Sequence, residues 1–236
     1  MHLSLQNKVF VVTGAAQGIG ADIVKGLVEE GAFVAAIDRD AEGLSALELL
    51  PGVECFCGDL SKACEAQRIC QKVVESRGAV HGLVTAAGGV CGQIGRPVEE
   101  ILEADWQAIF AANVDAAMWC AQALVPAMKQ KGAGRIVTIS SGAGLRPSLT
   151  GIQAYAAAKH ALVGLTRQLA LELGPAGITV NSIAPGFVLS NPSTQKQWDS
   201  LGAVRQEQVV NGIHLRRLGS GDDIADAVVF LCSDRA

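Results

Sequence analysis

The chain has 236 residues, of which 50% are hydrophobic and 18% charged, and its formal net charge is −4 at pH 7. This length allows one domain, or two, with a large buried core, and the weakly acidic balance gives no reason to expect nucleic-acid binding. No uninterrupted apolar run approaches the roughly 18–20 residues that span a bilayer. The first residues lack the basic and then apolar layout of a signal peptide, so we expect a cytoplasmic protein that does not contact a membrane.

Strand-like and helix-like segments alternate from one end of the chain to the other. The apolar runs predict strands at residues 8–13, 33–38, 53–57, 82–86, 135–140 and 179–183. Helical patterns predict helices at 19–30, 41–50, 61–77 with Ser61 as N-cap, 98–131 (one short and one long), 152–174, 193–212 (one or two) and 222–232. This alternation implies right-handed βαβ units in an α/β fold, a Rossmann-type doubly wound parallel sheet with helices on both faces.

The domain organisation follows from the same pattern. The chain contains no repeats, low-complexity tracts or linkers, so we predict a single domain over residues 1–236. Ligands of such sheets bind beyond the carboxyl ends of the strands. Seven cysteines form neither a Cys-x-x-Cys pair nor a zinc-type cluster, and His81 and His214 lack metal-binding partners. We therefore expect free, mostly buried thiols and no metal site.

A glycine-rich turn follows the first predicted strand, in the order Gly14, Gly18 and Gly20. Gly14 permits a tight turn, Gly18 lets backbone N–H groups approach a pyrophosphate at the helix N-terminus, and Gly20 allows close packing of helix on strand. The spacing is one residue longer than the usual dinucleotide fingerprint. Its place between a strand and a helix predicts a dinucleotide site.

The acidic residue expected of such a site is Asp38, which ends the second predicted strand, 18 residues beyond Gly20. Its carboxylate can accept hydrogen bonds from a ribose 2′-hydroxyl, whereas a 2′-phosphate would repel it by about 4 kcal/mol at 4 Å and an effective dielectric of 20. Gln17 also stands where a basic residue would grip that phosphate. These features favour NAD over NADP, although Arg39 could turn toward a phosphate.

Tyr155 is the only tyrosine, and Lys159 follows it by four residues in an alanine-rich segment. This spacing places the two side chains one helical turn apart on the same face. A nearby ammonium favours the phenolate and lowers its pKa, which would make Tyr155 a general acid and base near neutral pH. Alone, the same pattern also fits an amphipathic helix with one aromatic residue and one solvated lysine.

From about residue 5 to its end, the chain resembles the short-chain dehydrogenase/reductase family. The glycine turn and Asp59 in Gly58-Asp59-Leu60 match family motifs, whereas the family's Asn-Asn-Ala-Gly is represented by Thr85-Ala86-Ala87-Gly88 without either asparagine. The resemblance implies that the residues that contact NAD are Gly14, Gln17, Gly18, Ile19, Gly20, Asp38, Asp59, Leu60, Ala87, Gly88, Tyr155, Lys159, Pro185, Gly186, Val188 and Ser190.

The resemblance also implies a catalytic tetrad of Asn113, Ser141, Tyr155 and Lys159. Ser141, preferred over Ser140, would bind the substrate oxygen with Tyr155, which exchanges the proton while a hydride moves to or from the nicotinamide. Lys159 would lower the pKa of Tyr155 and bind the ribose, and Asn113, on the long helix, would hold a water. The expected activity is NAD-dependent oxidoreduction of a small-to-medium secondary alcohol or ketone by a homotetramer.

Alternatives to this activity depend on a few features. The altered Thr85-Ala86 pair leaves open a non-catalytic NAD-binding sensor or scaffold, although such a protein would not need the tetrad. A sugar-nucleotide epimerase or dehydratase would need a larger substrate domain. Residues 187–214 are expected to form a substrate lid, with Trp198 either capping the pocket or anchoring the lid. Arg146 could reach a substrate anion, but a surface or interface role is the simpler expectation.

The C-terminus departs from the family pattern. Family members continue into a seventh strand after the last helix, whereas this sequence stops at Ala236. Without that strand an apolar sheet edge would lie exposed, which natural proteins avoid. We therefore expect that a C-terminal strand is missing from this sequence.

Overall fold

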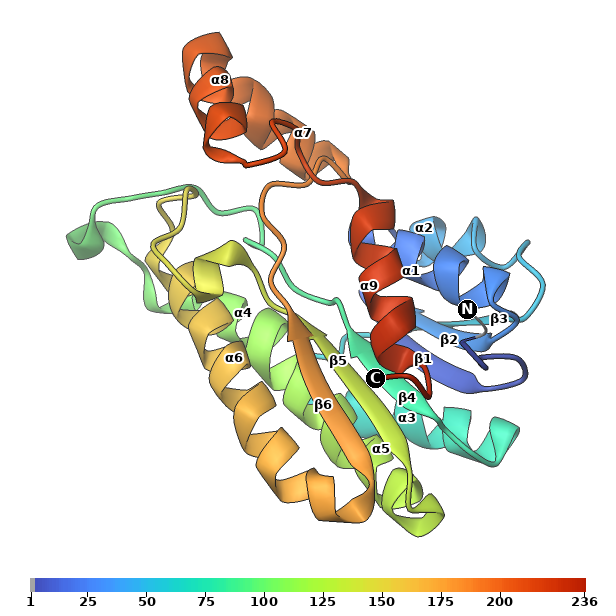
Figure 1. The fold of residues 1–236 in the computed structure, drawn as a ribbon. Helices are drawn as coiled ribbons and strands as arrows, with labels where there is room; N and C mark the ends of the chain where they lie inside the picture. Colours follow the sequence, from blue (N-terminus) through green and yellow to red (C-terminus); the bar gives the residue numbers. More distant parts are fainter. Residues whose placement is uncertain (1–2) are drawn as a thin grey trace.

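A computed structural model describes residues 3–236 of the chain. Residues 1 and 2, part of the start that lacks a signal-peptide pattern, lie outside the described residues. Within this range the fold is a single α/β domain around one six-stranded parallel sheet, in the order β3-β2-β1-β4-β5-β6 (Figure 1). The strands are β1 (Val9–Thr13), β2 (Phe33–Asp38), β3 (Val53–Cys57), β4 (Gly82–Thr85), β5 (Gly134–Ile139) and β6 (Ile178–Ile183). The predicted Rossmann-type fold is confirmed, and β3 and β6 form the sheet edges.

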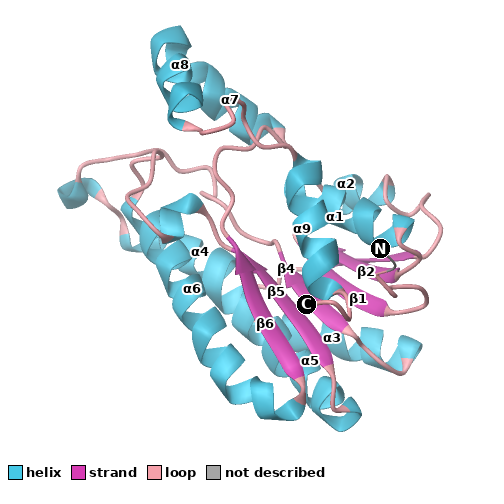
Figure 2. Ribbon diagram, viewed as in Figure 1, coloured by secondary structure: helices cyan, strands magenta, loops and turns pink. Residues whose placement is uncertain are grey.

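Helices cover both faces of the sheet (Figure 2). They are α1 (Gly18–Glu29), α2 (Ala41–Ser45), α3 (Ala63–Arg77), α4 (Glu103–Phe110), α5 (Ala116–Lys131), α6 (Gln153–Leu173), α7 (Pro192–Ser200), α8 (Gly202–Gly212) and α9 (Gly221–Cys232). Short 3-10 turns occur at Val98–Glu100, Gly142–Gly144 and Gly174–Ala176, and a π-helical turn at Ala111–Asp115 joins α4 to α5. Each crossover between parallel strands therefore carries a helix, as doubly wound folds require.

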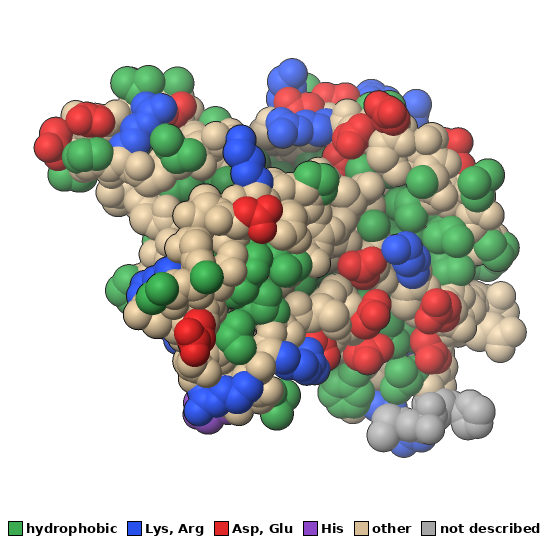
Figure 3. Space-filling view, turned by 90° about the horizontal axis from the view of Figure 1, so that it is seen from above, with side chains coloured by type: hydrophobic (Ala, Val, Ile, Leu, Met, Phe, Trp, Pro, Cys, Tyr) green, Lys and Arg blue, Asp and Glu red, His purple; other side chains and the backbone are tan. Residues whose placement is uncertain are grey.

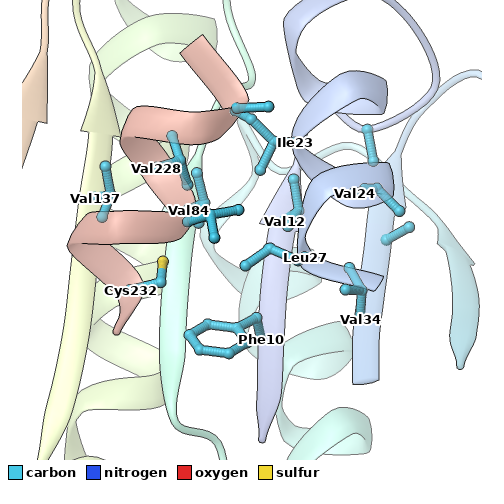
Figure 4. Close-up of a cluster of buried hydrophobic side chains, with 14 of the residues drawn as sticks. Phe10, Val12, Ile23, Val24, Leu27, Val34, Val84, Val137, Val228 and Cys232 are labelled. Carbon is cyan, nitrogen blue, oxygen red and sulfur yellow. The ribbon is translucent and has the colours of Figure 1, made fainter. Parts of the chain in front are cut away.

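Alternation along each strand divides the core into two layers, because successive side chains point to opposite faces of a sheet. In β1, Phe10 and Val12 pack under α1 and α9 together with Val84 and Val137 (Figure 4). Val9 and Val11 face the other layer, where the sheet meets α3, α5 and α6. Burial on both faces explains why the strands are continuous apolar runs in the sequence.

Some predicted boundaries were wrong. Ser61 does not cap α3: the N-cap residue is Lys62, without a side-chain cap, and the Ser61 hydroxyl donates instead to Asp59 at 2.7 Å. The helix expected at 41–50 ends at Ser45 and continues as turns. The region 98–131 holds a 3-10 turn and then one helix from Glu103 to Lys131 that contains the π-helical turn.

That continuous helix has the length and average hydropathy of a membrane span, although no uninterrupted apolar run in the sequence does. It is the one helix among residues 3–236 that meets these criteria, which core helices of soluble proteins also meet. Here α5 places Cys120, Leu124 and Met128 in the core layer against α3 and the sheet. Its apolar residues are therefore explained, at least on this face, by packing within the domain.

The parallel strands place all their carboxyl ends on one side of the molecule. The predicted lid segment forms α7 and α8, which stand away from the sheet on this side (Figure 1). Seen from above, this side carries both basic and acidic side chains rather than a patch of one sign (Figure 3). A site on this side is therefore bounded by the strand ends and, on the lid side, by α7.

Candidate active site

A cleft of about 830 Å³ lies at the carboxyl ends of the strands, within the size range of small-molecule and cofactor sites. It extends from the glycine turn after β1 to the loops after β4, β5 and β6 and to α7. Sixteen of the predicted site residues line it: Gly14, Gln17, Ile19, Gly20, Asp38, Asp59, Leu60, Ala87, Gly88, Ser141, Tyr155, Lys159, Pro185, Gly186, Val188 and Ser190. Gly18 and Asn113 do not line it.

The glycine turn has the backbone geometry that its sequence predicts. Gly14 has a φ of 67°, and a Cβ there would lie 2.6 Å from both the N and the Cα of Ala87. A Cβ on Gly20 would overlap the carbonyl oxygen of Gly14, so the helix packs directly on the turn. Gly18 has a φ of 58° and sits beside the loop after β6, where a Cβ would lie 3.1 Å from Ser190 Oγ. Backbone approaches of this kind are possible only without side chains.

Two carboxylates occupy the cofactor end of the cleft. Asp38 Oδ2 accepts a hydrogen bond from the backbone N–H of Ala16 (3.1 Å), and Oδ1 accepts one from Asp40 (3.0 Å). These bonds hold the acid at the end of β2, beside the glycine turn. Asp59 accepts bonds from both the N–H and the hydroxyl of Ser61, which lower the pKa of its carboxyl. Arg39 lines the same end of the cleft.

The two serines at the end of β5 differ in their surroundings. Ser140 is buried, and its Oγ donates to the backbone carbonyl of Lys159 at 3.1 Å, so it joins β5 to α6. Ser141 is half-buried in the cleft, where its Oγ accepts the N–H of Ala143 at 3.1 Å. That bond leaves the hydroxyl proton of Ser141 available to a substrate oxygen.

Tyr155 and Lys159 lie in the first two turns of α6, as their spacing predicts. Lys159 Nζ is 5.7 Å from the centre of the Tyr155 ring and donates to the carbonyl of Ile139 at 2.9 Å. Burial lowers the pKa of Lys159 to about 8. Burial also raises the pKa of Tyr155, and the nearby Ser141 hydroxyl opposes this rise only in part. The protein alone therefore shifts the phenol in the direction opposite to the one expected from the lysine, and a lowered pKa stays a prediction for the NAD complex.

Asn113 lies in the π-helical turn, and its side chain binds protein backbone. Its Nδ2 donates to the carbonyls of Ile109 (2.8 Å) and Gly89 (2.9 Å), and its Oδ1 accepts the N–H of Gly89 (2.9 Å). A Cβ on Gly88 would overlap the same Oδ1. The carboxamide therefore fixes the loop after β4, and the expected water-binding role has no direct support from these contacts.

The altered motif after β4 leaves one polar group without a partner. Thr85 Oγ1 is buried and, among residues 3–236, has no hydrogen-bond partner. The next turn is nevertheless held, because the N–H of Ala87 donates to Thr13 Oγ1 at 3.2 Å. The loss of both asparagines thus changes local hydrogen bonding without moving Ala87 and Gly88 out of the cleft.

Several residues of the cleft could not be assigned from the sequence. Cys91 and Arg146 line it, on the loops after β4 and β5, and Phe187 lines it after β6. Trp198 is not among the lining residues: its ring packs on Phe187 at 5.2 Å between centroids, which anchors α7 to that loop. The proximity of these residues depends on how long loops fold back, for which the sequence carries no periodic signal.

Comparison with known proteins identifies the family. A family model described as short chain dehydrogenase matches residues 8–200. Dehydrogenase/reductase SDR family member 4 of Sus scrofa is 35% identical over 246 residues, which cover 98% of this chain and 83% of the relative.

Solved structures give the same answer. NAD+-bound xylitol dehydrogenase has a TM-score of 0.91 at 27% identity, over 98% of this chain and 94% of the other. A candidate NAD(P)-dependent gluconate 5-dehydrogenase from Beutenbergia cavernae, with NADP at low occupancy, has a TM-score of 0.89 at 33% identity, over 100% and 93% of the two chains. The fold, the arrangement of the cleft and these similarities together place the chain in the short-chain dehydrogenase/reductase family.

Proposed function

We propose that this oxidoreductase is an NAD-dependent alcohol dehydrogenase or carbonyl reductase that acts on small-to-medium secondary alcohols or ketones. The observation that carries the proposal is that Ser141, Tyr155 and Lys159 line the same cleft as the glycine turn. A module that only binds a dinucleotide would have no use for a half-buried phenol beside a buried ammonium. This argues against the alternative of a sensor or scaffold.

The residues that fit NAD are those of the glycine turn, Asp38, Asp59 and the loops after β4 and β6, where side chains are small or absent beside the backbone. When bound, the nicotinamide supplies or accepts the hydride. Ser141 and Tyr155 hold the substrate oxygen and orient the reacting carbon. The ammonium of Lys159 donates one N–H to the carbonyl of Ile139, so its other two N–H groups remain available to ribose hydroxyls.

Proton transfer belongs to Tyr155. In carbonyl reduction its phenol gives a proton to the substrate oxygen as the hydride reaches the carbon, and in alcohol oxidation it takes that proton back. Because burial raises its pKa, the protein alone keeps the phenol protonated near neutral pH. This state suits reduction, whereas oxidation needs a phenolate that the charge of Lys159 must stabilise.

The preference for NAD rests on Asp38 and Gln17. A carboxylate held by two backbone N–H groups beside the turn favours a ribose hydroxyl and repels a 2′-phosphate. One structural relative is described with NAD+ and another with NADP, so the relatives do not favour either cofactor. The proposal of NAD therefore depends on Asp38 and Gln17 of this chain. We also propose a homotetramer, in keeping with the apolar composition and with the long helices α5 and α6.

The test is a panel of secondary alcohols and ketones assayed with NAD(H) and NADP(H) in parallel, for wild type and Tyr155→Phe. We expect turnover with NAD(H), and a loss in kcat of about 10²–10⁴-fold in Tyr155→Phe with NADH binding retained. Full activity in this variant would show that another group moves the proton. Binding of NAD without turnover of any substrate would favour the scaffold. Light scattering of the purified protein reports its oligomeric state.

A further inference from the structure

Arg146 is a charged residue of the cleft that the proposed chemistry does not use. It follows Ser141 by five residues, on the loop between β5 and α6. A Cβ built on Gly142 would lie 3.9 Å from both Nε and Nη2 of Arg146. The guanidinium therefore lies close to Gly142, the neighbour of Ser141, while the arginine remains exposed to solvent at the cleft.

The guanidinium has no partner within the part of the chain that the structure describes. No carboxylate lies within 4.0 Å of it, and its nitrogens donate to no acceptor among residues 3–236. Some arginines of the chain are paired, since Arg77 binds Glu54 at 2.8 Å and Arg217 binds Asp223 at 2.6 Å. Others, such as Arg39 and Arg167, form no ion pair among residues 3–236 but differ from Arg146 in not lying at the substrate end of the cleft. Arg146 thus presents five unused N–H donors at the cleft.

The acidic side chains that line the cleft all lie at one end, where Arg39 lies as well. The acids are Asp38 and Asp59, which follow β2 and β3 at the cofactor end. At the substrate end, the loop after β5 and the start of α6 contribute Arg146 and Lys159. Among the residues lining that end, none is acidic. The substrate end is therefore positive, and an anion there would meet no repulsion from the protein.

We propose that Arg146 selects substrates that carry a carboxylate or a phosphate close to the alcohol or ketone that reacts. Arg146 would bind this group bidentately while Ser141 and Tyr155 hold the reacting oxygen. Because Gly142 adjoins Ser141, and consecutive Cα atoms are about 3.8 Å apart, the anion belongs within a few bonds of the reacting carbon, as in a 2- or 3-oxo acid. This inference rests on the proposed oxidoreductase function and names its substrate class.

The test compares two ketone pairs that differ in charge, with NADH: 3-oxobutanoate against its methyl ester, and dihydroxyacetone phosphate against dihydroxyacetone. We expect the wild type to prefer at least one anion over its neutral partner by about tenfold or more in kcat/KM. The pair that shows the preference distinguishes a carboxylate from a phosphate. Arg146→Met should remove the preference mainly through KM, since the contact is made equally before and during the reaction. Arg146→Lys should keep part of it, because the charge remains but the planar fork is lost.

The control variant is Arg68→Met, which removes an exposed arginine on α3 outside the cleft and should leave the preference unchanged. The inference is overturned if neutral ketones are reduced as well as the anions, or if Arg146→Met lowers both members of a pair equally. It is also overturned if Arg146→Met weakens NADH binding instead, which would assign the guanidinium to the cofactor. If no ketone is reduced, the proposed function fails on this panel. In that case, calorimetry measures how tightly the same four compounds bind to the NADH complex. If the anions bind no tighter than their neutral partners, the inference about Arg146 is overturned.

Discussion

The cofactor end of the cleft is built from backbone and short turns, whereas the substrate end is built from long loops and side chains. At the cofactor end, glycines contact backbone directly, and Asp38 is fixed by two N–H groups. At the substrate end, the loops after β4, β5 and β6 and the lid carry many exposed large apolar side chains: Ile94, Val98, Leu102, Leu145, Leu149, Leu189, Val204 and Leu215.

This difference separates what the two ends recognise. A pyrophosphate needs N–H groups and close approach, which a glycine turn supplies regardless of its neighbours. A substrate is selected by the shape and charge of individual side chains on loops. Of the exposed apolar side chains on these loops, Leu149 lines the cleft itself. Variants of the glycine turn test whether cofactor binding depends on the backbone alone. Variants of Lys159, Asp38 and Thr85 test which side chains contribute to it.

The largest effect is expected for Gly14→Ala. The new methyl group would lie 2.6 Å from the backbone of Ala87 at a φ of 67°. A left-handed alanine costs roughly 1–2 kcal/mol and overpacking roughly 1–3 kcal/mol, so the free energy of unfolding should fall by about 2–5 kcal/mol. NADH binding should weaken with it, because the methyl group separates the loops after β1 and β4. Urea unfolding and NADH fluorescence measure the two effects.

Gly164→Ala is the matched control. Gly164 lies inside α6, and a Cβ there would meet no atom within 4 Å. The free energy of unfolding of this variant should be higher than that of the wild type by roughly 0.5–1 kcal/mol, because alanine loses less conformational entropy than glycine when it enters a helix. If Gly14→Ala folds and binds NADH like the wild type, the cofactor end tolerates side chains and the contrast between the two ends is wrong.

Lys159→Met tests a side chain shared by both ends. The pKa of Lys159 is lowered from 10.5 to about 8 by complete burial, so holding its charge costs about 3 kcal/mol below pH 8. Between pH 8 and 10.5 the unfolded chain binds more protons than the folded one, so wild-type stability rises with pH in this window. Lys159→Met has no such group. Between pH 8 and 10.5 the free energy of unfolding of the wild type should therefore rise by about 3 kcal/mol relative to that of the variant.

Urea unfolding of both proteins from pH 7 to 10.5 measures this difference, and NADH-dependent turnover at pH 7 should be lost in the variant. A difference in stability that does not change with pH would mean that Lys159 is charged in the folded protein throughout, with a compensating anion nearby. Glu172, which ends in solvent on the same helix and is paired with Lys129, offers a control in Glu172→Gln. This change should leave the pH profile above pH 8 unaltered.

Asp38→Asn tests the one acidic side chain placed against the glycine turn. The change removes the charge but keeps the size of the side chain. The ratio of kcat/KM with NADP to kcat/KM with NAD should therefore rise by about tenfold or more relative to the wild type. Asp40→Asn is the control, because Asp40 caps α2 two residues later and does not line the cleft. An unchanged ratio in Asp38→Asn would assign cofactor choice to Gln17 or Arg39.

The part of the site that could be predicted is the part encoded locally. Strand ends, the glycine turn and the Tyr155–Lys159 spacing depend on neighbours within a few residues. The side chain of Asn113 binds Gly89, which is 24 residues away in the chain and could not be identified as its partner from local sequence, while its expected role in holding a water stays a prediction. Burial, which raises the pKa of Tyr155 in the protein alone, is determined by the tertiary structure and could not be assessed from the Tyr155–Lys159 spacing, and the lowered pKa in the NAD complex stays a prediction. Ser61 was assigned to a helix cap, but its hydroxyl binds Asp59 instead.

Arg146 illustrates the same limit at the substrate end. Its sequence position allowed a surface, an interface or a substrate role, and the structure places it at the cleft because the loop after β5 turns back at Gly142. A sequence without periodic signal does not determine such a turn. The substrate end therefore has to be inferred from side-chain positions, whereas the cofactor end can be inferred from glycine spacing.

The smallest effect is expected at the junction of the two ends, where Thr85 ends β4. Its buried Oγ1 has no partner among residues 3–236, and an unmade hydrogen bond of this kind costs about 1–3 kcal/mol. Thr85→Val keeps the shape and should raise the free energy of unfolding by about 1 kcal/mol. Thr138→Val, which breaks the 2.8 Å bond between Thr138 and Thr166, should lower it by about 1 kcal/mol. If Thr85→Val instead lowers the free energy of unfolding and weakens NADH binding, the hydroxyl of Thr85 forms a polar contact in the complex. The cofactor end of the cleft would then include Thr85, a side chain that backbone contacts alone do not indicate.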